Sequence, residues 1–447
     1  MDLKIRKIFF YCLIGIFVLL GAYLVITAQG WVLDIKNFKI VKTGSLYLRY
    51  SPTDAAIDIN GKPSNASPGI LTSGVLISRL IPDDYDIKIS EPGYLPWRKT
   101  LTVGEATVTS ESQIKLWPET WNFKGVATSS ISDFWLTGAG AVLQLKDGTL
   151  HLDGSMLRGQ QVTLSDPNSS ILISSDGKSY FLTDLGNPKI PVNISNLFNE
   201  LIQSQSSSTA VEVPKQFFLH PFNGNKILIT TGNGLYSLDW KRDSLIKLTS
   251  VKNVVSAAAS NNEVFLEDEN GNLVVSNIFL QTSSVYGPGL PANGIMKPSP
   301  GGSFAFFLDG NGGLEDYDRS SNVTSTISGN AANFFISYDE RNLALISNDG
   351  NLSFIALNDY YADGSVKKSD KWTVLASSDE ITDFKWMSDY SDYGLALAGG
   401  KLSIVELDRR MPENFYPVTD GVKKFFVQGS DLYVLKSDGT LLETSLK

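Results

Sequence analysis

The chain has 447 residues and a formal net charge of −9 at pH 7. One hydrophobic core rarely grows beyond roughly 250–300 residues, so this length predicts more than one domain. Apolar residues make up 42% and charged residues 19%, which excludes a mainly disordered protein. The acidic balance argues against nucleic-acid binding as the main activity, because phosphate backbones would be repelled.

Residues 1–33 are predicted to form a short cytoplasmic tip and one transmembrane helix. Residues 8–26 are uncharged, and as a helix they extend about 28 Å, close to the thickness of a bilayer's hydrocarbon core. The alternative is a cleaved signal peptide, but the apolar region of a signal peptide is shorter, about 7–15 residues. A signal peptide also ends in a small-x-small cleavage site, and the stretch "VITAQG" of this sequence matches that pattern poorly. Lys4, Arg6 and Lys7 precede the helix, so the N-terminus is expected in the cytoplasm and the bulk of the chain outside it, at the cell membrane.

The only cysteine, Cys12, lies inside this apolar segment. Intrachain disulfides and thiolate metal clusters are therefore excluded. Lipidation is disfavoured, because the bulky residues 9–11 stand where a lipobox needs small ones.

After a connector over residues 34–42, residues 43–117 are predicted to form a small antiparallel β-sandwich. Apolar and polar residues alternate in several short runs, as in a half-buried strand. The runs are separated by turn signals such as Asn60-Gly61 and Pro92-Gly93.

This segment resembles the PEGA domain, a small extracytoplasmic β module. The residues that carry the resemblance are Pro52, Ala55, Asn60, Gly61, Pro68, Tyr85, Gly93, Tyr94 and Trp97. Two features depart from the family pattern: Thr53-Asp54 replaces the namesake Glu-Gly, and Asp84 replaces the glycine before Tyr85. The resemblance implies a binding or spacer module without catalytic residues. Tyr94 and Trp97 either cap the end of the sandwich or stack against a ligand.

Residues 120–447 contain eight hairpin-like units, each with a strand, a glycine turn and a second strand. The turn glycines are Gly148, Gly177, Gly234, Gly271, Gly312, Gly350, Gly400 and Gly439. From the first to the last of them the mean spacing is about 42 residues, the length of one four-stranded propeller blade. The segment is therefore expected to form a β-propeller of seven or eight blades, giving a mainly β protein.

Two parts of this domain have their own expected roles. Residues 192–214 lengthen one interval and are predicted to be an insertion with an amphipathic helix followed by a Ser/Gln loop. The strand-like residues 121–129 are predicted to complete the last blade. The units resemble WD-repeat and TolB-type propellers at the level of architecture only, because the Gly-His and Trp-Asp signatures are absent.

No motif specifies a reaction, a metal or a cofactor. The two histidines, His151 and His220, have no G-x-S-x-G partner motif, and zinc ligands do not cluster. The acidic stretches from Glu267 and from Asp309 lack the spacing of a calcium loop and indicate hairpin turns.

These patterns predict a non-enzymatic, membrane-anchored scaffold that presents its propeller to a protein partner or a cell-envelope polymer. No nucleic-acid partner is expected. The alternative function is a propeller-type hydrolase acting on a glycan or another envelope substrate through a pair of carboxylates.

Overall fold

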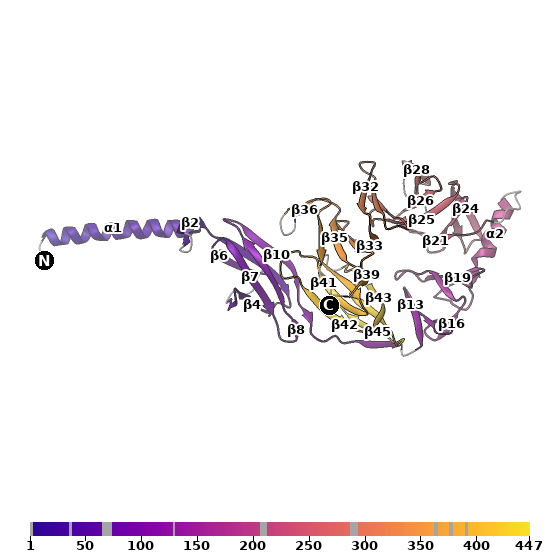
Figure 1. The fold of residues 1–447 in the computed structure, drawn as a ribbon, viewed down its shortest axis with the longest axis horizontal. Helices are drawn as coiled ribbons and strands as arrows, with labels where there is room; N and C mark the ends of the chain where they lie inside the picture. Colours follow the sequence, from indigo (N-terminus) through magenta and orange to yellow (C-terminus); the bar gives the residue numbers. More distant parts are fainter. Residues whose placement is uncertain are drawn as a thin grey trace. The chain divides into compact units, whose positions relative to one another are not determined.

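The computed structural model describes residues 3–34, 38–64, 74–127, 130–205, 212–286, 294–361, 365–374, 379–388 and 392–447. The described chain is mainly β, with one long N-terminal helix (Figure 1). It divides into two compact units. Unit 1 comprises Met1–Trp121 with Asp408–Tyr416, and unit 2 comprises Asn122–Leu407 with Pro417–Lys447. The segment Asp408–Tyr416, which lies within the predicted domain 120–447, groups with unit 1.

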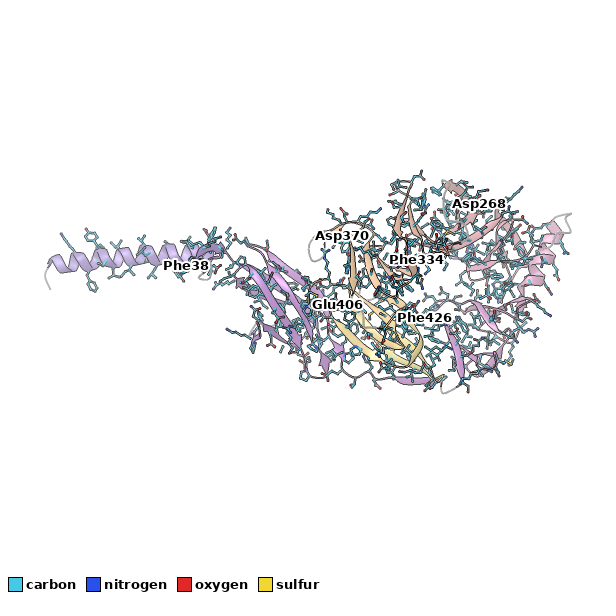
Figure 2. The ribbon with its side chains drawn as sticks, in the orientation of Figure 1. Phe38, Asp268, Phe334, Asp370, Glu406 and Phe426 are labelled. Carbon is cyan, nitrogen blue, oxygen red and sulfur yellow. The ribbon has the colours of Figure 1, made fainter. Side chains whose placement is uncertain are left out.

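The N-terminal helix α1 extends over Leu3–Ala28. Its window Phe9–Ala28 has a mean hydropathy of 2.6, and none of it is buried in the protein. Length and composition suit a membrane span, although a signal sequence has the same properties. Strand β1 (Trp31–Asp34) begins within the segment 1–33 predicted as tip and helix, and it pairs with β2 (Lys39–Lys42) of the expected connector. Phe38, labelled in Figure 2, precedes β2 and is 84% exposed.

Besides the β1–β2 hairpin, the described residues of unit 1 form two larger sheets and a short strand pair. The first sheet has the order β10 (Val108–Lys115), β3 (Gly44–Ser51), β6 (Val75–Leu80). The second has the order β5 (Lys62–Pro63), β4 (Ala56–Ile59), β7 (Asp83–Ser90), β9 (Trp97–Val103), and β8 (Tyr94–Leu95) pairs with β11 (Trp117–Pro118). β10 runs parallel to β3, against the antiparallel expectation. It follows β9 from the other sheet, so no tight hairpin imposes an antiparallel direction on it.

The two sheets of unit 1 share one hydrophobic core. Alternate residues of β3 and β9 are buried, as the period of a strand with one core-facing side requires. Leu46 and Leu48 from the first sheet pack in one cluster with Ile87, Trp97 and Leu101 from the second.

Eight four-stranded sheets, numbered here in chain order, are formed by the described residues of unit 2, with Phe415 and Tyr416 of unit 1 beginning the strand β42 of the seventh. The first four are β13 (Ile131–Thr137), β14 (Gly140–Leu145), β15 (Leu150–Leu152), β16 (Ser155–Leu157); β17 (Gln161–Leu164), β18 (Ile171–Ser175), β19 (Tyr180–Asp184), β20 (Val192–Asn193); β21 (Gln216–Leu219), β22 (Lys226–Thr231), β23 (Gly234–Asp239), β24 (Ser244–Thr249); and β25 (Val254–Ser260), β26 (Glu263–Asp268), β27 (Leu273–Asn277), β28 (Thr282–Tyr286).

The other four sheets are β29 (Ile295–Pro298), β30 (Phe304–Leu308), β31 (Leu314–Asp318), β32 (Val323–Ser328); β33 (Ala331–Ile336), β34 (Asn342–Ser347), β35 (Leu352–Ala356), β38 (Lys371–Val374); β39 (Ile381–Trp386), β40 (Tyr393–Ala398), β41 (Lys401–Glu406), β42 (Phe415–Thr419); and β43 (Val422–Gln428), β44 (Asp431–Lys436), β45 (Leu441–Ser445), β12 (Lys124–Ala127). A small hairpin of β36 (Tyr360–Tyr361) and β37 (Ser365–Val366) precedes β38.

The eighth sheet joins the two ends of unit 2. Its outer strand β12 pairs with the C-terminal strand β45, as the strand-like residues 121–129 predict, although 128 and 129 lie outside the described residues. Ile131 and Phe134 of the first sheet then share a core cluster with Leu435 and Leu441 of the eighth. The last sheet therefore packs against the first.

Neighbouring sheets pack face to face through buried apolar side chains. In β26, Val264 and Leu266 pack with Leu228 of the preceding sheet, whereas Phe265 packs with Phe307 of the following one. Figure 1 shows the sheets succeeding one another in chain order around a ring. Because each sheet buries both faces only between two neighbours, the ring supplies the core that one sheet lacks. This arrangement is that of a β-propeller.

The eight turn glycines occupy equivalent places. Each lies at the turn between the second and third strands of its sheet, Gly234 as the first residue of β23. All have a positive φ, a conformation that favours glycine: Gly148, Gly177, Gly234, Gly271, Gly312, Gly350, Gly400 and Gly439. Within residues 192–214, helix α2 spans Ile194–Gln205 and buries Phe198 against the second and third sheets. Residues 206–211 of that insertion lie outside the described part.

Candidate functional site

The first strands of the eight sheets lie on the inner side of the ring. These inner strands, as we call them, are β13, β17, β21, β25, β29, β33, β39 and β43. First strands of successive sheets contact each other: β25 contacts β29, and β33 contacts β39. The fourth strands β28 and β32 are instead largely exposed. Figure 2 shows Phe334 and Phe426, from β33 and β43, on this inner side.

The inner strands are positively charged although the whole chain is acidic. They contain four lysines, Lys297, Lys385, Lys423 and Lys424, against two aspartates, Asp133 and Asp383, a net formal charge of +2. The chain as a whole carries −9. The inner side of the ring therefore differs in sign from the rest of the protein, which favours an anionic partner there.

One lysine joins the eighth sheet to the first. The ammonium group of Lys424 donates to Asp133 Oδ1 at 2.6 Å and to the carbonyl oxygen of Phe134 at 2.8 Å. Its nitrogen also lies 4.9 Å from the ring centroid of Trp135. The ion pair is only about one third exposed on each side, with 33% for the lysine and 35% for the aspartate side chain. Its neighbour Lys423 donates to the carbonyl oxygen of Ser132 at 2.6 Å.

A second lysine joins the fifth sheet to the sixth by the same set of contacts. Lys297 donates to Asn333 Oδ1 at 3.1 Å and to the carbonyl oxygen of Phe334 at 2.9 Å. Its nitrogen lies 4.5 Å from the ring centroid of Phe334 and 5.2 Å from that of Phe335. In the third sheet, Lys215, just before β21, reaches the carbonyl oxygen of Val254 in the fourth at 2.7 Å.

The seventh sheet places another cation beside this junction. The ammonium group of Lys385 lies 4.9 Å from the ring centroid of Phe335 and pairs with Asp383 at 3.3 Å. Trp386 donates its indole N–H to the carbonyl oxygen of Phe335 at 2.9 Å, which fixes the two strands together. Burial, and next the positive charge of Lys385, lower the pKa of Lys297 to about 8, while Asp383 opposes the change.

This arrangement is suited to binding an anionic or aromatic group. Lysine ammonium groups of one inner strand lie beside the half-buried rings of Trp135 and Phe335 on a neighbouring one, and such pairs hold carboxylates and flat apolar groups. Both inner-strand carboxylates, Asp133 and Asp383, already pair with lysines. Within the described residues, no group of three or more His, Cys, Asp or Glu side chains has the geometry to hold a metal ion.

The residues of the PEGA resemblance lie in the core and turns of unit 1. Trp97 is fully buried in β9, so its ring has no free face for a ligand, which rules out ligand stacking on it. Tyr94 is half-buried, and the Tyr85 hydroxyl donates to the carbonyl oxygen of Ile81 at 2.8 Å. Pro52 and Ala55 precede β4, and Asn60 and Gly61, both with positive φ, form the β4–β5 turn. Gly93 also has a positive φ, and Pro68 lies outside the described residues.

The histidines take part in local contacts. His151 is half-buried in β15, with Nε2 2.9 Å from the hydroxyl of Thr149. His220 lies in the loop after β21, where burial and then the charge of Lys226 lower its pKa.

Both acidic stretches form hydrogen-bonded turns. Asp268 accepts backbone N–H bonds from Asn270 and Asn272, and Asp309 accepts them from Asn311 and Gly313. These carboxylates stabilise the turn between the second and third strands of their sheets. The preceding Glu267 is instead buried in β26.

Sequence reasoning did not single out the inner-strand lysines and aspartates. A signal was available: Ser132-Asp133-Phe134, Ala332-Asn333-Phe334 and Thr382-Asp383-Phe384 repeat a small residue, an acid or its amide, and phenylalanine. Each stands at the start of a first strand, upstream of a hairpin glycine. Aligning the repeats on those strands as well as on the glycines reveals the pattern.

The solved structures named below resemble this chain with TM-scores under 0.5. No protein-family model and no curated protein matches the sequence. The computationally designed Ika8 protein is similar with a TM-score of 0.47 and 12% identity, over 72% of this chain and 98% of that one. BamB from Moraxella catarrhalis is similar with a TM-score of 0.45 and 13% identity, over 73% of this chain and 98% of that one. Kluyveromyces lactis Hsv2p is similar with a TM-score of 0.44 and 10% identity, over 64% of this chain and 96% of that one. At these scores, the β-propeller assignment rests on the sheet topology of the chain itself.

Proposed function

We propose that this chain is a membrane-anchored, extracytoplasmic scaffold whose propeller binds a partner through the inner strands. In this proposal α1 is the anchor, unit 1 is a PEGA-like spacer and the eight sheets are the eight blades of one propeller. The partner is a protein or a cell-envelope polymer. The role is binding rather than catalysis, in keeping with the interaction surfaces that loops and strand ends of rigid folds provide.

The observation that carries the binding role is the reversed charge of the inner strands. The inner strands carry a net charge of +2 beside half-buried rings on a chain of charge −9, and a local reversal of sign attracts an anionic partner to that side. The anchor is supported by the 20-residue apolar window of α1, whose side chains nothing in the protein covers. The hydrolase alternative needs a carboxylate pair poised for acid and base roles, and the two inner-strand carboxylates are instead held by lysines.

Single cysteines test the membrane topology. With Cys12→Ala as background, Lys178→Cys places a thiol on the exposed hairpin turn of the second sheet. In intact cells we expect a membrane-impermeant maleimide to label this site. The matched variant Asp2→Cys should be labelled only after the cells are permeabilised. The opposite pattern, or equal labelling of the two sites in intact cells, refutes the extracytoplasmic placement.

Affinity capture with the full detergent-solubilised chain tests the binding role. The variant Lys385→Gln/Lys423→Gln removes two inner-strand charges, and Lys178→Gln/Lys189→Gln removes two exposed charges away from the inner strands. We expect one protein or polymer to be recovered with the wild type and with the second variant, and at least tenfold less with the first. Equal recovery with all three proteins contradicts binding through the inner strands.

A further inference from the structure

Two junctions between sheets use the same lysine contacts with different charges. Lys424 and Lys297 each bond the side-chain oxygen of the third residue of the next inner strand and the carbonyl oxygen of the phenylalanine that follows it. At the junction of the eighth and first sheets that third residue is Asp133. At the junction of the fifth and sixth sheets it is Asn333, so Lys297 has the same contacts without the counter-charge.

The surroundings of Lys297 do not supply the missing negative charge. Lys385 stands at the same Phe335 ring, at 4.9 Å from its centroid against 5.2 Å for Lys297. Asp383 pairs with Lys385, so among the described residues two ammonium groups share one carboxylate. Burial is the main cause of the lowered pKa of Lys297, and the charge of Lys385 lowers it further.

One donor of Lys297 remains for a ligand. An ammonium group has three N–H donors, and Lys297 uses two of them, on Asn333 and Phe334. Both Lys297 and Phe335 are only half-buried, and the side chain of Lys385 is 36% exposed. Each of the two lysines thus offers a partly exposed ammonium group beside the Phe335 ring.

We propose that Lys297 and Lys385 form a site for one carboxylate group, which supplies the charge that Asp133 provides at the equivalent junction. The proposal deepens the proposed function, because it rests on the inner strands as the binding surface and gives the chemistry of the group bound there. A carboxylate fits because its two oxygens accept from two ammonium groups at once. Its source is either a small carboxylic acid or the acidic side chain of a polypeptide.

Lysine acylation measured residue by residue tests this site in the full chain in detergent. The probes are acetate and a hexaglutamate peptide, each compared with chloride at equal ionic strength. We expect either probe to slow acylation of Lys297 at least threefold relative to chloride. Lys424, which already has Asp133, serves as the internal control and should change less than 1.5-fold. Protection by the peptide alone assigns a polypeptide source, and equal protection by acetate assigns a small acid.

Exchanging the charges between the junctions gives matched variants. Asn333→Asp should make Lys297 behave like Lys424, with slower acylation in chloride and no further protection by the probes. Asp133→Asn should make Lys424 sensitive to the probes. Lys385→Gln keeps both contacts of Lys297 and should at least halve the protection, which provides a test if Asn333→Asp does not fold.

Two results would overturn the proposal: chloride protecting Lys297 as well as carboxylates do, or Asn333→Asp keeping wild-type protection. Failure of the site and failure of the scaffold role are separable. Carboxylate protection of Lys297 with no captured partner leaves the site standing and removes the scaffold role. A partner captured equally by wild type and Asn333→Asp, without carboxylate protection, does the reverse.

Discussion

Replacing Glu267 by glutamine should stabilise unit 2 in a pH-dependent way. This side chain is 0% exposed, and neither of its carboxylate oxygens has a hydrogen-bond partner. It lies in β26 opposite Ser256 and Leu273, on the side of the strand that packs with the fifth sheet. Burial, and next the charge of Asp268, raise its pKa from 4.5 to about 7. The folded protein therefore holds a carboxylate that resists ionisation.

The pKa difference gives the sign and size of the effect. Below about pH 4.5 the group is protonated in both the folded and unfolded states and adds no ionisation penalty. As the pH rises towards about 7, the unfolded chain ionises first, so the free energy of unfolding falls. Above that pH the loss reaches about 3 kcal/mol, at roughly 1.4 kcal/mol per pKa unit. Glu267→Gln has nearly the same shape and removes this loss.

Thermal unfolding of the full chain between pH 4.5 and 8.5 measures the effect. At about 2 °C per kcal/mol for a unit of this size, the variant should gain roughly 6 °C in Tm at pH 8.5 and almost nothing at pH 4.5. Glu200→Gln, on the exposed side of α2, is the control and should show no such pH-dependent gain. A difference in Tm between Glu267→Gln and wild type that stays constant across this range would falsify the ionisation argument.

Three further substitutions test the packing. Lys99 is fully buried in unit 1 and donates to the carbonyl oxygens of Asp408 and Arg410. Lys99→Met should therefore destabilise the segment 408–416 by about 3 kcal/mol, measured as faster hydrogen exchange in that segment. Unchanged exchange contradicts this prediction. Phe198 is fully buried and its ring packs against Tyr236. Phe198→Ala should lower the free energy of unfolding by about 3–5 kcal/mol and speed hydrogen exchange in α2. Exchange in α2 equal to that of the wild type would show that Phe198 does not anchor the helix. Gly234→Ala should lower the free energy of unfolding in urea by about 2 kcal/mol or more, because φ is 141° and the added Cβ meets the carbonyl oxygen of Thr249. Gly148→Ala, with open space around the added Cβ, should lower it less. The reverse order of the two variants refutes the argument.

Local features of the sequence determined the strands, the turns and the apolar N-terminal helix. The glycines from Gly148 to Gly439 mark the hairpins because only residues close in the chain form a tight turn, and the alternation in β9 shows which side faces a core. The strand-like residues 121–129 also predicted the closing strand β12, since a ring of hairpins leaves one place for it.

The tertiary structure alone decided which distant residues meet. It set β10 parallel to β3 and grouped Asp408–Tyr416 with unit 1. It also brought Lys297 to Asn333, and both Lys297 and Lys385 to the aromatic ring of Phe335. None of these follows from neighbouring residues, because each depends on how whole sheets stack and on which charges come to face each other across the stack. For the inner strands, the same Lys–carbonyl contact occurs twice, and only the three-dimensional comparison shows that one copy lacks its counter-charge.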